Sequence, residues 1–110
     1  WIYSFDANTG SLSSKEDPLG NKTRYIYQTA ATGQNLLYRQ FTPVNATTEY
    51  ITTYLAYDDF GKPLHVIGQA RISHIDQPID MDVSYTYDNA NYDRLTSVTN
   101  NITGVTIDMT

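Results

Sequence analysis

The sequence predicts an all-β fold in which consecutive antiparallel β-hairpins form one extended, repeat-built sheet. Ten of the 110 residues are tyrosine and many are threonine, and aromatic and β-branched side chains suit a pleated strand. Short runs of these residues are separated by Asp, Asn, Pro and Gly, which favour tight turns. No window of about 12 residues has the apolar spacing of an amphipathic helix.

A hairpin in the middle of the chain shows the pattern. Residues 50–57 are rich in Tyr, Thr and Ile and predict a strand. Asp58 and Gly61 then supply turn chemistry, because Asp bonds to the backbone two residues on and Gly accepts a positive φ. An apolar run resumes at Leu64, so we expect a strand, a tight turn and a return strand.

The other elements follow the same reasoning along the chain. We expect loops or turns at residues 6–10, 17–21, 29–34, 42–46, 58–61, 76–80 and 88–93. Gly68 is expected to mark a bulge or a break. Return strands begin at Leu12 and near Pro63, and β-type sequence continues from Leu95. The remaining strands are expected at residues 1–5, 22–28, 36–41, 47–57, 70–75 and 83–87.

A unit made of a strand ending in an aromatic residue, then a turn and a leucine, recurs about four times. The aromatics Phe5, Tyr27, Tyr57 and Tyr87 are separated by 22, 30 and 30 residues. Spacings of 20–50 residues are typical of repeat architectures, whose units are stable only against their neighbours. The repeat residues are Tyr3, Phe5, Asp6, Gly10, Tyr25, Tyr27, Gly33, Tyr57, Asp58, Gly61, Leu64, Tyr85, Tyr87, Asp88, Arg94 and Leu95.

Bulk composition excludes several classes of function. The net charge of −5 argues against binding to nucleic acid or to anionic membranes. The absence of cysteine excludes disulfides and thiolate metal sites. No apolar run approaches about 18 residues, so we expect no membrane-spanning helix. Because the sequence starts and stops within patterned segments, we expect one repeat region belonging to a longer protein, with open edges prone to self-association.

These repeats resemble the RHS (rearrangement hot spot), or YD-repeat, family. The family unit is approximately Tyr-x-Tyr-Asp-x-x-Gly-Arg-Leu-x-x-Val, often followed by a turn similar to Asp-Pro-x-Gly-Asn. Matching segments are Tyr85-Thr86-Tyr87-Asp88 with Arg94-Leu95, Tyr57-Asp58-Asp59-Phe60-Gly61, Tyr3-Ser4-Phe5-Asp6 with Gly10, and Tyr25-Ile26-Tyr27 with Gly33. The segment 17–21, Asp-Pro-Leu-Gly-Asn, matches the turn.

The sequence departs from the family unit in several places. The segment from Asp6 to Gly10 is one residue too long, and Gln28 replaces the aspartate of its unit. Pro63 is inserted before Leu64, and Asp93 stands where glycine is expected. Leu55 replaces the first aromatic of its unit. Residues 38–53 and 68–82 match poorly.

The resemblance implies a structural function. Family repeats build long sheets that wind into a hollow shell, as in bacterial insecticidal toxin complexes, contact-dependent toxins and teneurin-type cell-surface proteins. It implies flanking repeats as partners, an enclosed toxin domain as cargo, a secreted or cell-surface bacterial location, and no enzymatic activity or cofactor. Some members carry a self-cleaving aspartate segment, but Asp17-Pro18 lies between two repeats and is interpreted as a turn.

Candidate chemistry elsewhere in the sequence is weak. Asp76, Asp80 and Asp82 carry oxygen ligands suited to Ca²⁺, but their spacing matches no EF-hand loop, and a solvated acidic loop is the preferred interpretation. His65 and His74 have no third ligand in view and are interpreted as surface or cross-strand residues.

A different class of function also fits the composition. Exposed tyrosines on an open sheet can bind carbohydrate or protein, so an adhesin-like β module is the alternative to the shell. Structural ladders of tyrosine on neighbouring strands are the commoner use of such residues, and each cross-strand pair contributes roughly 0.2–1 kcal/mol. An enzyme is the least favoured class, because no catalytic motif occurs and adjacent Asp58 and Asp59 would point to opposite faces of a strand.

Overall fold

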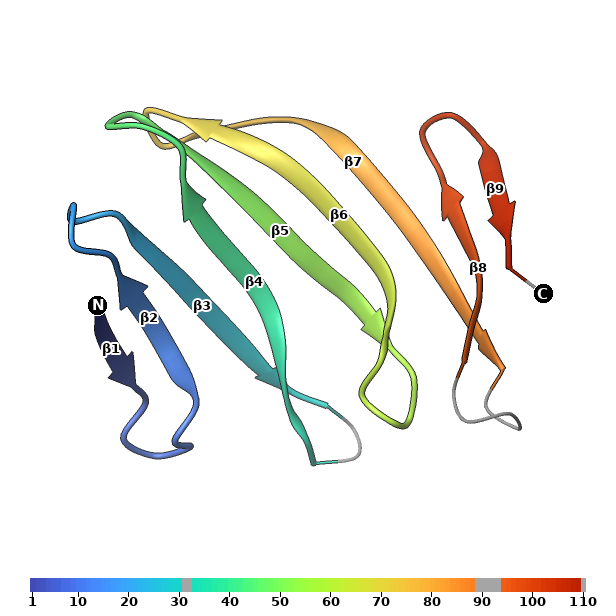
Figure 1. The fold of residues 1–110 in the computed structure, drawn as a ribbon, viewed down its shortest axis with the longest axis horizontal. Coiled ribbons are helices and arrows are strands. Elements are labelled where there is room, and N and C mark those ends of the chain that lie inside the picture. The colour runs from blue at the N-terminus through green and yellow to red at the C-terminus, as the bar shows by residue number, and fades with distance from the viewer. Residues whose placement is uncertain (31–32, 89–93, 110) are drawn as a thin grey trace.

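Nine antiparallel strands form one open sheet in the computed structural model, which describes residues 1–30, 33–88 and 94–109. The strands lie side by side in the order in which they occur in the chain (Figure 1). No helix occurs in these described ranges, which confirms the predicted all-β class. The strands are β1 (Ile2–Phe5), β2 (Leu12–Glu16), β3 (Lys22–Thr29), β4 (Asn35–Pro43), β5 (Thr48–Tyr57), β6 (Pro63–Ile72), β7 (Ile75–Asp88), β8 (Arg94–Asn100) and β9 (Val105–Asp108).

Each strand therefore forms a hairpin with the next one, as the sequence predicts. The turns alternate between the two ends of the sheet. All the Tyr-Asp units end at one of these two ends, which is the lower end in Figure 1. The two termini lie at opposite edges, on β1 and β9 (Figure 1). Both edge strands are exposed along their whole length.

One predicted loop is wrong. Residues 76–80 belong to β7, and the hairpin turn lies earlier, at Ser73 and His74. These two residues have φ values of 50° and 66°, the left-handed geometry of a primed two-residue turn. The expected strand over residues 70–75 is split by this turn. β8 pairs with β7 only from Val83 onward, so the first half of β7, which contains Pro78, is bonded on one side, a position that tolerates proline.

Gly68 lies within β6, beside a register shift rather than at a strand break. The partner of Gly68 on β7 is Met81 and that of Gln69 is Ile79, so Asp80 is the extra residue of a bulge. A Cβ atom on Gly68 would lie 2.3 Å from the hydroxyl oxygen of Tyr50. Glycine is therefore required here because the Tyr50 ring lies across the strand. The Tyr50 hydroxyl continues past it to donate a 2.7 Å hydrogen bond to Asp80 Oδ1.

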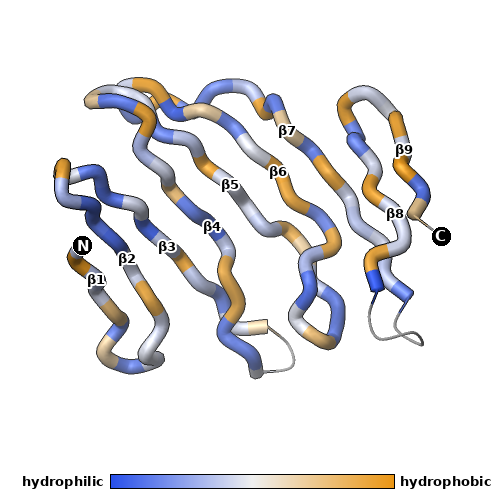
Figure 2. Tube along the Cα trace, viewed as in Figure 1, coloured by the Kyte–Doolittle hydropathy of each residue, from blue (hydrophilic) through white to orange (hydrophobic). Residues whose placement is uncertain are grey.

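The sheet has very little buried interior. Its radius of gyration is 15.9 Å, against about 13 Å for a compact chain of this length. Among the described residues, the buried apolar side chains are Phe41, Ile51 and Val66. Apolar and polar segments alternate along the strands instead of gathering in one region (Figure 2). Stability therefore depends on contacts between neighbouring strands rather than on a second layer.

The register assigns side chains to two faces. Directly paired residues share a face, and so do alternate residues of one strand. One paired row across β3 to β7 consists of Tyr25, Gln40, Thr52, Gly68 and Met81. Tyr54 lies two residues after Thr52, and its partner Val66 pairs with Val83. Tyr85 lies two residues after Val83, so Tyr25, Tyr54 and Tyr85 share one face. We call this the tyrosine face. The opposite face carries Arg24, Phe41, Ile51, Glu49 and Arg71.

Candidate functional site

The four repeat aromatics occupy equivalent positions in the sheet. Each lies opposite a β-bulge at the end of a hairpin, where the return strand has one extra residue. The extra residues are Ser13, Tyr38, Leu64 and Thr96. The partnered pairs are Phe5 with Leu12, Tyr27 with Leu37, Tyr57 with Pro63, and Tyr87 with Leu95. Leu64 is thus the bulged residue of its unit, and the inserted Pro63 takes the paired position.

Three turns share one backbone pattern. In the turns that begin at Asp17, Ala30 and Asp58, the N–H of the first residue bonds to the carbonyl of the fifth. The N–H of the fourth residue, a glycine with φ near 85°, bonds to the carbonyl of the first. The glycines are Gly20, Gly33 and Gly61. The turn 17–21 is therefore the same local structure as the Tyr-Asp turn, at the other end of the sheet.

The aspartates of these turns cap their own backbone. Asp58 Oδ1 accepts hydrogen bonds from the N–H groups of Phe60 and Lys62, both at 2.9 Å. Burial raises the pKa of this carboxyl, but the bonds with Lys62 and Phe60 outweigh it and lower the pKa. Asp17 accepts from the Asn21 side chain and N–H and from the Leu19 N–H, and these bonds lower its pKa.

The longer turn that begins at Asp6 is a second type, and it recurs at Asn100. In both, a side-chain oxygen of the first residue accepts bonds from the N–H groups two and three residues on. Gly10 and Gly104 close them by bonding back to the first carbonyl. The extra residue between Asp6 and Gly10 thus belongs to a regular turn.

The last repeat is described only in part. Asp88 and Arg94 are the final pair between β7 and β8, and Leu95 pairs with Tyr87. The predicted turn over residues 88–93, with Asp93 at the expected glycine position, falls almost entirely outside the described residues.

Tyrosine hydroxyls tie each hairpin to the previous one. Tyr87 donates a 2.9 Å hydrogen bond to the carbonyl of Pro63, and Tyr57 donates to the carbonyl of Leu37. Each acceptor belongs to the return strand of the preceding hairpin, at its bulge. Burial raises the pKa of Tyr87, and burial with the neighbouring Tyr54 raises that of Tyr57 to about 12.

Lys62 adds a second link between the same two hairpins. Its ammonium lies 2.9 Å from Asp58 Oδ2, 4.8 Å from the Phe60 ring centre and 5.3 Å from the Tyr87 ring centre. A lysine enclosed by a carboxylate and two ring faces is held by charge and cation–π attraction together. Lys62, in the turn of one repeat, thereby contacts Tyr87, the motif tyrosine of the next repeat.

Rings on the tyrosine face lie close enough to influence one another. Tyr54 stacks with Tyr57 at 6.2 Å between ring centres. Burial raises the pKa of Tyr54, as do the nearby hydroxyls of Tyr85 and Tyr25. Burial beside Tyr25 also raises the pKa of Tyr27. At the β1 edge, Tyr3 stacks with Trp1 at 6.5 Å.

The candidate calcium ligands do not converge. Asp80 accepts from Tyr50, Asp76 lies 3.4 Å from Arg71 Nε, and Asp82 Oδ1 contacts His65 Nε2 at 2.6 Å. The bond from Asn101, followed by that from His65, lowers the pKa of Asp82. No group of three His, Asp or Glu residues suited to a metal occurs within the described residues. His65 and His74 lie apart, His65 within β6 and His74 in the β6–β7 turn.

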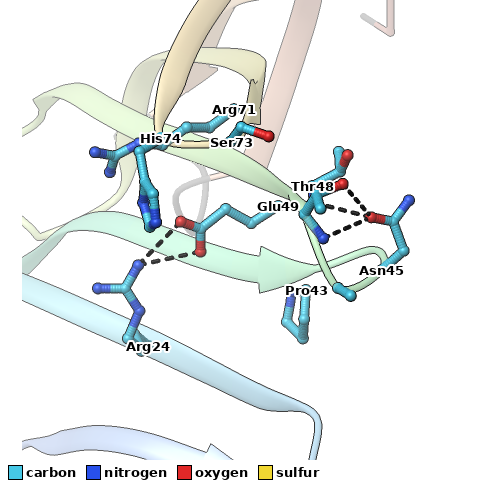
Figure 3. Close-up of a pocket in the computed structure, with 10 residues that line it drawn as sticks. Arg24, Pro43, Asn45, Thr48, Glu49, Arg71, Ser73 and His74 are labelled. Carbon is cyan, nitrogen blue, oxygen red and sulfur yellow. Dashed lines mark hydrogen bonds and ion pairs between the residues drawn. The ribbon is translucent and has the colours of Figure 1, made fainter.

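A pocket of about 460 Å³ opens on the face opposite the tyrosines. It lies between the β4–β5 loop and the Ser73–His74 turn, and Figure 3 shows Arg24, Arg71 and His74 around Glu49. Arg24 Nη2 binds both carboxylate oxygens of Glu49 at 3.1 and 3.2 Å. No pattern in the sequence indicates this pocket. Its charged residues come from three strands and a turn with no glycine, and only the register brings them together.

Comparison with known proteins gives no family assignment: no protein-family profile, curated protein or solved structure matches this chain. No helix in the described residues is long and apolar enough to cross a membrane.

Proposed function

We propose that this chain is a non-enzymatic wall segment of an RHS/YD-repeat shell that encloses or carries a toxin cargo. The observation that carries the proposal is the equivalence of Phe5, Tyr27, Tyr57 and Tyr87, each opposite a bulge of its hairpin. A repeated bulge bends and twists each hairpin near the same end of the sheet. Repetition of one bend is what a curved wall requires.

The bonding between hairpins supports a wall rather than a globule. The hydroxyls of Tyr57 and Tyr87 and the ammonium of Lys62 all make contacts from one hairpin to its neighbour. Such nearest-neighbour contacts stabilise an array in proportion to its length, without a closed core. Further repeats would extend the same pattern from either edge.

The proposal also implies particular partners and a cellular location. The partners are flanking repeats and an enclosed toxin domain, and the location is secreted or on a bacterial cell surface. The adhesin-like alternative receives less support, because the hydroxyls of Tyr50, Tyr57 and Tyr87 are engaged within the sheet. Carbohydrate binding that disappears in a Tyr85→Ala, Tyr87→Ala double variant would reverse this ranking.

Electron cryomicroscopy of the full-length protein that carries this sequence tests the shell. The expected result is a hollow particle whose wall contains this nine-stranded segment continued by paired strands at both edges. A solid domain, in which a second layer of structure covers either face of the sheet, would overturn the proposal.

A further inference from the structure

The pocket on the face opposite the tyrosines is built by two neighbouring hairpins. Asn45 and Thr47 come from the β4–β5 loop, and Ser73 and His74 come from the β6–β7 turn. A hydrogen bond of 2.8 Å from the Ser73 N–H to the Thr47 carbonyl joins the two rims. The two rims are therefore joined through the backbone, and the volume of about 460 Å³ lies in the range of small-molecule sites.

Two guanidinium groups define its chemistry. Arg24 lies over the Phe41 ring at 4.3 Å, which orients its planar group while one nitrogen binds Glu49. Glu49 pairs directly with Arg71 in the sheet register. Arg71 is more weakly engaged: its Nε lies 3.4 Å from Asp76 Oδ1 and has no hydrogen-bond partner within the described residues. An arginine carries five N–H donors in a fork that matches a carboxylate.

Acceptors and hydroxyls complete the lining. Thr47, Thr48 and Ser73 present hydroxyl groups, and Glu49 presents a carboxylate that is about a quarter exposed. The imidazole of His74 makes no hydrogen bond within the described part of the chain, and its backbone is held at a φ of 66°. The residues that line the pocket carry two arginines and one glutamate, and Asp76 lies beside Arg71.

We propose that this pocket binds a small carboxylate-bearing sugar, such as a hexuronate. The carboxylate lies against the Arg71 guanidinium, which lines the hollow. Glu49 accepts hydrogen bonds from the sugar hydroxyls, and the threonine and serine hydroxyls accept from or donate to them. A neutral sugar leaves the Arg71 donors unpaired, and a simple carboxylate leaves the hydroxyl-lined rim unused. Discrimination rests on charge, because a neutral sugar offers no anion to pair with the guanidinium fork.

The inference is independent of the shell. It concerns the opposite face from the tyrosines, and its failure would leave the repeat geometry unchanged. Binding through this pocket is also distinguishable from binding through the tyrosines, because it depends on Arg71 and not on Tyr85 or Tyr87.

Amide chemical shifts of the 110-residue chain, titrated with sodium glucuronate, test the proposal. We expect saturable shifts at Thr47, Ser73 and His74, with none from glucose and weaker ones from acetate at equal ionic strength. The Arg71→Gln variant is expected to bind on the order of tenfold to a hundredfold more weakly, the loss of a charged hydrogen-bonding group. Arg39→Gln is the matched control, since it removes the same charge from the same face outside the pocket.

Several results would overturn the proposal. These are the absence of saturable shifts at the three amides, equal shifts from glucose, or equal affinity for acetate. A loss of affinity in Arg39→Gln as large as that in Arg71→Gln would indicate a general charge effect instead of this site. The shifts of the unmodified chain decide the matter even if a variant does not fold.

Discussion

The hydroxyl group distinguishes a motif tyrosine from a phenylalanine at the same register position. Tyr57 and Tyr87 each donate to a backbone carbonyl at the bulge of the preceding hairpin. A bulge interrupts the ladder and leaves main-chain groups that need other partners. The tyrosine thus gives a main-chain carbonyl at the bulge of one repeat a hydrogen-bond donor, and it joins that repeat to the next. Phe5, in the first hairpin, fills the same position without this capacity.

Replacement of Tyr87 by phenylalanine tests this role. We expect Tyr87→Phe to lower the free energy of unfolding by about 0.5–1.5 kcal/mol, because the Pro63 carbonyl loses its partner while the ring still packs. Urea denaturation followed by circular dichroism measures it. Tyr85→Phe is the control, since its hydroxyl makes no hydrogen bond within the described residues. Equal losses in the two variants would contradict the proposed link.

Packing of Tyr50 against Gly68 is a second effect of single residues. A Cβ on residue 68 would lie 2.9 Å from two carbons of the Tyr50 ring, closer than non-bonded carbons approach. We expect Gly68→Ala to destabilise the sheet by about 1–3 kcal/mol, the usual cost of overpacking. In a Tyr50→Ala background the same substitution is expected to cost much less. A double-mutant cycle by urea denaturation measures this coupling, and additive losses would contradict it.

At the scale of the element, the capped turns make stability depend on acid. The folded-state pKa of Asp17 lies below its ordinary value of 3.8, so its contribution to stability is present above that value and is lost as pH falls through the folded pKa. We expect the urea midpoint to fall between pH 7 and pH 3, and to fall less in Asp17→Asn, which keeps an acceptor oxygen without the titration. Asp59→Asn, at an exposed turn position, is the control and is expected to behave like the unmodified chain.

Turn chemistry also explains which elements could be predicted from the sequence. The turns at Asp6, Asp17 and Asp58 contain the Asp and Gly residues that their geometry requires, so the sequence alone predicts their positions. The Ser73–His74 turn contains neither glycine nor asparagine, and the loop predicted around Pro78 begins three residues too late in the chain. Only the unpaired side of β7 makes Pro78 compatible with a strand. The repeat aromatics, like the turns, could be predicted from local sequence. The pocket could not, because it depends on the register between strands that are distant in the sequence.

At the scale of the whole molecule, the open edges and the number of strands govern association. Every neighbouring pair is antiparallel, so β1 and β9, both odd-numbered, run in the same direction. A copy added head to tail would therefore pair β9 with β1 in parallel, the slightly weaker arrangement. When the tyrosine faces of the two copies lie on the same side, antiparallel edge pairing must be homotypic, β1 with β1 or β9 with β9, around two-fold axes. The exposed apolar residues Ile2 and Phe5 on β1 and Val105 and Ile107 on β9 favour such pairing.

This symmetry makes a specific prediction for the isolated 110-residue chain. We expect size-exclusion chromatography with light scattering to show concentration-dependent association beyond a dimer, because each molecule has two homotypic edges. A charged residue on an edge strand opposes pairing. Ile107→Lys, which blocks β9 alone, is expected to stop assembly at a dimer through β1, and Tyr3→Lys is expected to stop it at a dimer through β9. The double variant is expected to be monomeric. If instead either single variant were monomeric, the copies would associate head to tail, since blocking one partner of a β1–β9 contact is sufficient to abolish it.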